Sequence, residues 1–147
     1  MPASGEYRRF VFELTVQELK MTIRYCFGAP YVCNSLASEN GADPACVAGA
    51  FAHPAFLKEH HFRQLEKPLF LSCSQIDHTF PTESRNQAVD MMNEDGKTYN
   101  VQLFSGVEHG FALRGDPTKP YERWVKEESL RSIVGWFDFW LGTSKEK

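Results

Sequence analysis

The chain has 147 residues, close to the usual size of one domain, and 42% of them are apolar, so a sizeable core can form. Its net charge of −3 offers no basic surface for nucleic acid, and no apolar run approaches the roughly 18 residues of a membrane span. These features favour a small-molecule partner over a nucleic acid or a membrane.

Strand-like and helix-like segments alternate along the chain without repeats, which predicts a parallel sheet flanked by helices. The expected elements, in chain order, are a helix over 11–20, a strand over 22–25, a helix over 29–40, strands over 47–52 and 68–74, a helix over 83–93, a strand over 99–104 and a helix over 124–141. Thr82 is expected to cap the helix after it, and Gly96 to close that helix. No linker divides the chain, so residues 1–147 are expected to form one α/β domain.

The last expected helix has the clearest amphipathic pattern of the chain. Its apolar residues recur at helical intervals and predict a face that packs on the sheet. These residues are Leu130, Ile133, Val134, Phe137, Trp140 and Leu141.

The histidines and cysteines are not arranged as a metal site. The four cysteines include no Cys-x-x-Cys pair, so neither a zinc ribbon nor a thioredoxin-type motif is present. His60, His61 and His78 lack the spacing of a metal-binding pair on a helix, and we expect no metal. Free thiols fit a reducing compartment, and the first residues show no secretory pattern, so we expect a cytoplasmic protein.

Cys26 is the most informative residue, because a short apolar strand runs there into a turn that begins a helix. This is the geometry of a nucleophile elbow, which raises one side chain above the carboxyl edge of a parallel sheet. The helix that follows directs its first N–H groups toward the thiol and favours the thiolate. Cys26 is therefore the candidate nucleophile.

Asp77 and His109 supply an acid and a base downstream, each just after a predicted strand. The carboxyl ends of parallel strands meet at one edge, where ligands bind. The order nucleophile, acid, histidine is that of α/β-hydrolases. The imidazole would carry the thiol proton and the carboxylate would fix the imidazole tautomer, so this chemistry requires no metal or organic cofactor.

Each candidate also has a purely structural interpretation. Cysteines are commonly buried and inert, Asp77 could be a turn residue before Phe80, and His109 could be a loop histidine. His53 would face the same edge after its own strand, where it could line a pocket or only bond loop backbone.

Several short motifs follow one another along the chain. They are Tyr25-Cys26-Phe27-Gly28, His53-Pro54, Lys67-Pro68-Leu69-Phe70-Leu71, Asp77-His78-Thr79-Phe80-Pro81, His109-Gly110-Phe111-Ala112 and Trp136-Phe137. Together they resemble the carboxyl-terminal half of the dienelactone hydrolase family of α/β-hydrolases, from about residue 21 to residue 141.

The resemblance implies a Cys-Asp-His triad that acts on a small ester or lactone. Cys26 would be the nucleophile, His109 the general base and Asp77 the residue that orients it. It also implies that Arg114 meets a substrate carboxylate, although a surface salt bridge is an equal alternative.

Two features depart from that family. Its elbow reads Gly-x-Cys-x-Gly, but position 24 is Arg, and the first glycine lets the elbow pack tightly against neighbouring backbone. The family's early strands, with the loop that carries a second oxyanion donor, have no counterpart, so we expect a truncated α/β-hydrolase fold with about four mostly parallel strands. The backbone N–H of Phe27 is the oxyanion donor that is left, and loss of one donor costs about 100- to 1000-fold in turnover.

Three hypotheses for the function follow. The first is a hydrolase of a small ester or lactone that uses the triad. The second is a catalytically silent fragment or pseudoenzyme that keeps the fold for association, in which self-association could cover the exposed edge of the strand at 22–25. The third is a thiol redox sensor at Cys26, for which the sequence offers no obvious resolving partner.

Overall fold

A four-stranded parallel sheet forms the centre of the computed structural model, which describes residues 19–38 and 42–146. The strands β1 (Lys20–Tyr25), β2 (Cys46–Ala52), β3 (Leu69–Ile76) and β4 (Tyr99–Glu108) lie side by side in this order, and each pair is parallel. The helices are α1 (Ala29–Ser35), α2 (Glu59–Arg63), α3 (Thr82–Glu94), α4 (Phe111–Arg114) and α5 (Pro120–Lys145), and a 3-10 turn, η1 (Cys26–Gly28), precedes α1. The predicted α/β class and its four parallel strands are confirmed.

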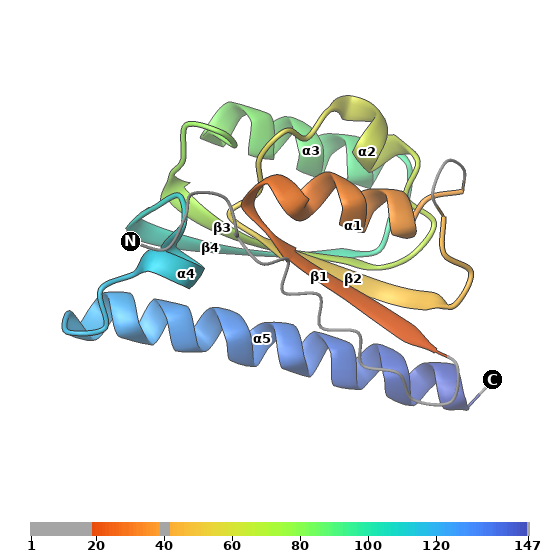
Figure 1. Cartoon of the computed structure of the whole chain (residues 1–147). Helices are drawn as coiled ribbons and strands as arrows, with labels where there is room; N and C mark the ends of the chain where they lie inside the picture. Colours follow the sequence, from red (N-terminus) through yellow and green to blue (C-terminus); the bar gives the residue numbers. More distant parts are fainter. Residues whose placement is uncertain (1–18, 39–41, 147) are drawn as a thin grey trace, which may run out of the picture.

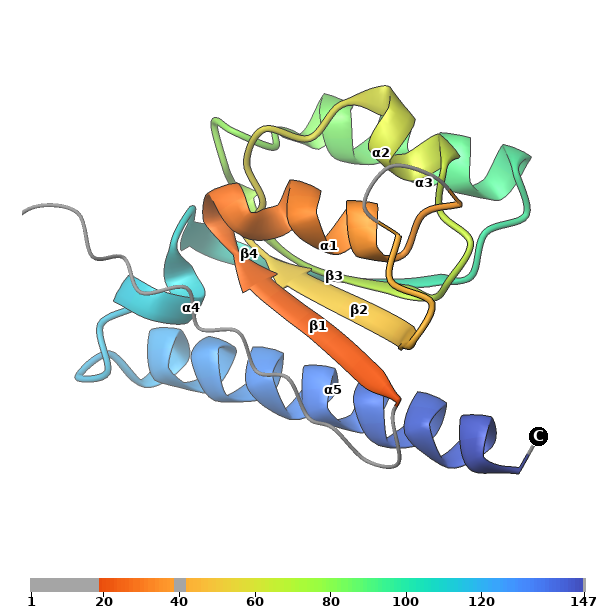
Figure 2. The ribbon, with the colours of Figure 1, turned by 45° about the vertical axis from the view of Figure 1, so that its right-hand side comes forward.

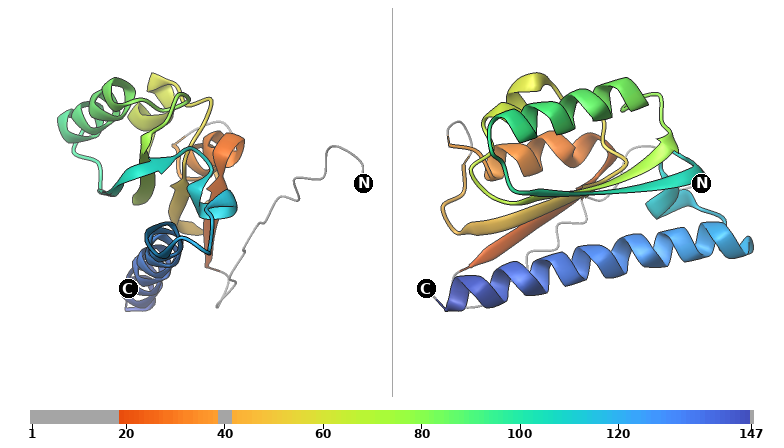
Figure 3. Two further views of the ribbon diagram at one scale, coloured as in Figure 1. Left: turned by 90° about the vertical axis from the view of Figure 1, so that its left-hand side faces the viewer. Right: turned by 180° about the vertical axis from the view of Figure 1, so that it is seen from behind.

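The helices form two layers around the sheet. Helices α1, α2 and α3 cover one face, and the long helix α5 crosses the other (Figures 1 and 3). A cluster that includes Val32, Phe51, Leu71 and Met92 fills the first interface, and a second cluster that includes Ile133 fills the interface with α5. The arrowheads of the strands and the short helix α4 lie at the same end of the molecule (Figure 2).

The central strands β2 and β3 are buried on both faces, as expected for a parallel sheet with two helical layers. Gly49 is needed where α1 crosses β2. A Cβ at this position would come within 2.7 Å of side-chain atoms of both Val32 and Leu36. The glycine therefore sets how closely the α1 layer approaches the sheet.

Three expected helices differ from those observed. The helix predicted over 29–40 ends at Ser35, and Ala37 then forms an antiparallel bridge with Leu65. Most of the helix predicted over 11–20 lies outside the described residues, but its last residue, Lys20, begins β1. Thr82 is the first residue of α3 rather than its cap, and Pro81 occupies the cap position.

The packing face of α5 also differs from the predicted one. The buried stripe is Val125, Ser129, Ile133 and Phe137, which repeats every four residues. Leu130 and Val134 were expected to pack on the sheet, but they are 55% and 48% exposed. Each lies one residue beyond the buried stripe and so about 100° around the helix from it.

Candidate active site

Cys26 occupies a strained turn at the carboxyl end of β1. Its φ is +50°, a left-handed conformation that a non-glycine residue rarely adopts. Two hydrogen bonds stabilise this conformation: the Cys26 carbonyl accepts one from the Ala29 N–H and one, at 3.0 Å, from the Ala55 N–H. Strained residues of this kind concentrate at functional sites, and the predicted elbow geometry is confirmed at this position.

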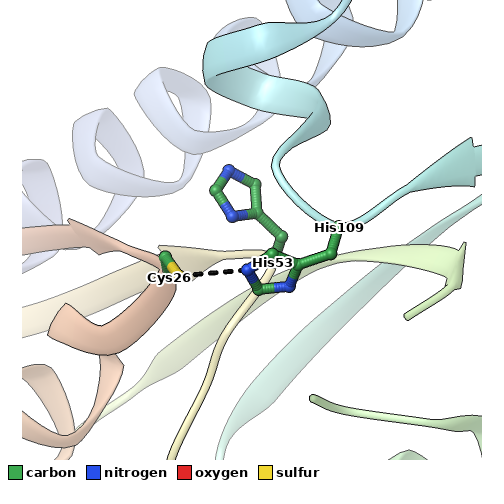
Figure 4. Close-up of side chains that lie close together, drawn as sticks. All are labelled: Cys26, His53 and His109. Carbon is green, nitrogen blue, oxygen red and sulfur yellow. Dashed lines mark hydrogen bonds between the residues drawn. The ribbon is translucent and has the colours of Figure 1, made fainter. Parts of the chain in front are cut away.

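A continuous hydrogen-bonded chain runs from Cys26 through His109 to Asp77. The Cys26 Sγ lies 3.0 Å from the His109 Nε2 (Figure 4). On the other side of the ring, the His109 Nδ1 lies 3.0 Å from both carboxylate oxygens of Asp77. These residues follow β1, β4 and β3 at one edge of the sheet, so the predicted convergence of the three side chains is confirmed.

The carboxylate of Asp77 is buried, with 1% of its side chain exposed. Its Oδ1 accepts the backbone N–H groups of Thr79 at 2.9 Å and Phe80 at 3.1 Å, and the hydroxyl of Ser74 approaches its Oδ2 at 3.3 Å. Burial by itself would raise the pKa of Asp77, but hydrogen bonds from Thr79 and His109 outweigh it and lower the pKa below its ordinary value. Asp77 is therefore held as a carboxylate beside the imidazole.

Thr79 is a residue of the site that was not predicted from the sequence. Its Oγ1 lies 2.7 Å from the Asp77 Oδ1, 2.9 Å from the His109 Nδ1 and 2.9 Å from the carbonyl oxygen of Pro54. A hydroxyl has one proton, so Thr79 can donate either to Asp77 or to Pro54 at a given moment. Donation to Asp77 stabilises the carboxylate beside His109, whereas donation to Pro54 joins Thr79 to the loop after β2.

His53 lies against the same side chains from the end of β2. It is 1% exposed and has a φ of +36°, and its ring centroid is 5.0 Å from that of His109 and 5.4 Å from that of Phe111. Neither of its ring nitrogens has a hydrogen-bond partner among the described residues. Burial, together with the nearby His109, lowers the pKa of His53 to about 4, so the ring is neutral at physiological pH.

One set of side chains in the described part of the chain has the composition and spacing of a metal site. One ligand atom each from Cys26, His53 and His109 lies within 4.8 Å of the other two. Sequence spacing could not indicate this group, because its members follow three different strands. Figure 4 shows the three side chains facing a common space.

A surface hollow of about 620 Å³ adjoins the other side of His109, between β4 and the start of α5. His78, Arg114 and Lys119 are among its lining residues, whereas Cys26 and His53 are not. Arg114 forms no ion pair with the described residues, so the alternative of a salt bridge within this part of the chain is not supported. Its guanidinium lies over Gly110, where a Cβ would approach to 2.6 Å.

Arg24 packs against the elbow at the position where the family has a glycine. A Cβ added to Gly28 would lie 2.8 Å from the Arg24 Cβ, so the remaining glycine accommodates the arginine stem. The Arg24 Nε and Nη1 are buried and have no hydrogen-bond partner among the residues that the structure describes. Phe27 follows Cys26 in η1 and is 47% exposed, and Cys26 itself is partly exposed.

The other three cysteines lie in the core. Burial raises the pKa of Cys33 and Cys73 to about 12 and that of Cys46 to about 11. Cys26 is the one partly exposed thiol of the four.

A parallel sheet between two helical layers, with an elbow cysteine at its carboxyl edge, defines the α/β-hydrolase class of fold. Residues 14–141 match the dienelactone hydrolase family, and the chain belongs to that family. Among the described residues, no helix combines the length and apolar character that crossing a membrane requires.

Three similar proteins place the chain within that family and fold. It is 40% identical to Dienlactone hydrolase 1 of Gibberella moniliformis over 119 residues, which are 81% of this chain and 44% of that protein. It is 33% identical to Dienlactone hydrolase 2 of the same organism over 119 residues, 81% of this chain and 39% of that protein. Esterase 2 of Thermogutta terrifontis, solved after phosphorylation by paraoxon, has a similar fold, with a TM-score of 0.60 at 16% identity over 78% of this chain and 53% of the esterase. The chain thus spans less than half the length of these two curated relatives.

Proposed function

We propose that the chain is a thiol hydrolase of small carboxylic esters or lactones, and that residues 1–147 act as a single partial α/β-hydrolase domain. The observation that carries the proposal is the hydrogen-bonded chain from the Cys26 Sγ through His109 to the buried carboxylate of Asp77. A nucleophile, a base and a residue that orients the base, each within hydrogen-bond reach of the next, are the parts that covalent hydrolysis requires.

The proposed reaction begins when the Cys26 Sγ attacks the carbonyl carbon and the His109 Nε2 takes the thiol proton. The Phe27 N–H stabilises the oxyanion that forms. When the tetrahedral species collapses, the leaving alkoxide takes the proton from His109 and an acyl thioester remains on Cys26. A water molecule, deprotonated by His109, then attacks the thioester and restores the thiol. Throughout these steps, Asp77 holds the proton on Nδ1 toward itself and stabilises the imidazolium.

The proposed substrate is a small ester or lactone, and a carboxylate on it would be favoured. Arg114 lines the hollow beside His109 without an ion pair among the described residues, so its guanidinium is available to an anionic group. His53 would form part of the wall on the opposite side of His109. Both roles are proposals for substrate binding rather than for the bond-breaking step.

The alternative is a catalytically silent relative that keeps this fold for association. The observation that favours it is Arg24, which stands where the family elbow has glycine and whose buried Nε and Nη1 have no hydrogen-bond partner among the described residues. Self-association through the β1 edge would be one use of such a protein.

The test is hydrolysis of nitrophenyl acetate by the full chain and by Cys26→Ala. We expect slow but measurable turnover by the wild type, because an activated leaving group reduces the need for a second oxyanion donor, and no turnover by the variant. Cys46→Ala is the matched control, since it removes a thiol at the opposite end of the sheet. Equal rates for wild type and Cys26→Ala would refute the hydrolase and favour the silent alternative.

A further inference from the structure

Three side chains at the carboxyl edge of the sheet are close enough together to bind a metal ion. We propose that Cys26, His53 and His109 form a binding site for one thiophilic divalent cation such as Zn²⁺, and that this cation switches off the active site. The inhibition rests on the proposed hydrolase function, whereas the metal binding stands on the geometry alone.

The donor set suits a borderline-soft metal. Zn²⁺ is bound by thiolate sulfur and imidazole nitrogen, and three protein ligands with one open position are a common arrangement for it. The three ligand atoms lie within 4.8 Å of one another. In a tetrahedral site with usual metal–ligand lengths they would be about 3.3 to 3.6 Å apart, so small side-chain rotations are sufficient.

His109 already has the orientation of a metal ligand. Its Nδ1 faces the carboxylate of Asp77 at 3.0 Å, and its Nε2 faces the thiol. Metal-binding histidines usually donate their other ring N–H to a carboxylate in this way, which fixes the tautomer and raises the basicity of the ligand nitrogen. The pair of Asp77 and His109 can therefore serve hydrolysis or a metal, but not both at once.

His53 supplies the independent observation. A buried imidazole normally finds a hydrogen-bond partner, yet both nitrogens of His53 have none among the described residues. With neither nitrogen engaged by the described residues, the His53 ring can offer a lone pair to a metal ion. The rings of Tyr25 and Phe111, with centroids 5.8 and 5.4 Å away, hold it beside His109. A metal ion would satisfy a polar group that the fold otherwise leaves unpaired.

Binding requires no redox partner. The metal forms a bond to the Cys26 Sγ, the thiol proton goes to solvent, and each histidine donates one lone pair. Cys26 is partly exposed, so a water molecule can complete the coordination from the solvent side.

The experiment is a titration of the reduced, chelator-treated full chain with Co²⁺, followed by the thiolate-to-cobalt absorption band, and then displacement by Zn²⁺. We expect one equivalent to bind with that band. Even partners outside the first coordination shell are worth about 10- to 100-fold in metal affinity, so His53→Asn should weaken binding by at least about tenfold. Asn tolerates a positive φ, which makes it the mildest substitution at this position. Cys26→Ser should abolish the band.

His60→Asn is the matched control, because it removes a histidine from the exposed surface of α2 and should leave the titration unchanged. A second measurement needs no substitution: stoichiometric Zn²⁺ should slow alkylation of Cys26 by iodoacetamide, and a chelator should restore it. The absence of the band, equal affinity in His53→Asn, or loss of binding in His60→Asn would each overturn the metal site. Metal binding by a chain that hydrolyses no ester would support the metal site and refute only the proposed function. Ester hydrolysis that stoichiometric Zn²⁺ leaves unchanged would refute the inhibition.

Discussion

Thr79→Val tests the hydrogen-bonded chain through a residue that performs no chemistry itself. Valine has nearly the shape of threonine but removes the hydroxyl that lies 2.7 Å from the Asp77 Oδ1 and 2.9 Å from the His109 Nδ1. Hydrogen bonds to charged groups contribute about 1.5 to 3 kcal/mol. Asp77 keeps the two backbone N–H groups of Thr79 and Phe80, so the lower end, about 1.5 to 2 kcal/mol of unfolding free energy, is expected at neutral pH.

The loss should depend on pH with a defined sign. The hydroxyl of Thr79 helps to lower the pKa of Asp77 in the folded protein. A lowered folded pKa stabilises the protein fully above the unfolded pKa of about 3.9, and that stabilisation is lost as the pH falls through the folded pKa. The stability difference between wild type and Thr79→Val should therefore be largest at neutral pH and should shrink below about pH 4.

Activity should fall as well, because a free energy of about 1.4 kcal/mol corresponds to a tenfold change in rate. We expect kcat/KM for nitrophenyl acetate to fall about tenfold in Thr79→Val and to stay near wild type in Thr79→Ser. Thr118→Val is the matched control, since its hydroxyl also bonds an aspartate two residues earlier, at 2.6 Å, but on the exposed surface. Wild-type stability and kcat/KM in Thr79→Val would refute the role given to this residue.

The elbow leads to three further predictions. With limiting iodoacetamide at neutral pH, adducts mapped by mass spectrometry should fall almost entirely on Cys26, and comparable labelling would contradict the burial of Cys33, Cys46 and Cys73. Gly28→Ala should destabilise the protein to urea by about 1 to 3 kcal/mol through overpacking, and Arg24→Gly should remove most of that loss, because the clash is with the Arg24 Cβ. An equal loss from Gly28→Ala in both backgrounds would show that this contact is not its cause. Arg24→Gly by itself should raise ester turnover by relieving strain at the elbow, and an unchanged rate would show that this strain does not limit the rate.

The parts of the fold that the sequence predicted are those with a strong local pattern. The strand at Cys46–Ala52 is a continuous apolar run, and Tyr99 begins β4 as expected. The short helix α2 was missed because five residues carry no helical period, and β4 runs on to Glu108 through Ser105 and Gly106, which break its alternation.

The positions of Leu130 and Val134 were predicted wrongly for a different reason. A helical period shows which residues share a face, but it does not say which part of an apolar face contacts the sheet. That choice is made by the partners in the second core cluster, such as Ile23 and Phe70, and these lie far away in the sequence.

The residues of the candidate site also differ in whether a local sequence pattern predicts them. Cys26, Asp77 and His109 were predictable, because each follows a strand and the carboxyl edge of a parallel sheet brings such residues together. The role of Thr79 and the unpaired ring of His53 depend on distances between loops, which no spacing in the sequence encodes. The stem of Arg24 against Gly28 is also a three-dimensional contact, although Arg24 itself was visible as a departure from the family elbow.

The most direct test of the account is detection of the acyl thioester. The full chain is mixed with nitrophenyl acetate, quenched in acid within the first turnover, and digested for mass spectrometry. We predict an acetyl group on Cys26, formed together with a burst of nitrophenol, and strong loss of both in His109→Ala because the base that removes the thiol proton is gone. Turnover without an adduct on Cys26, or an adduct that forms equally fast in His109→Ala, would contradict the proposed thiol hydrolase.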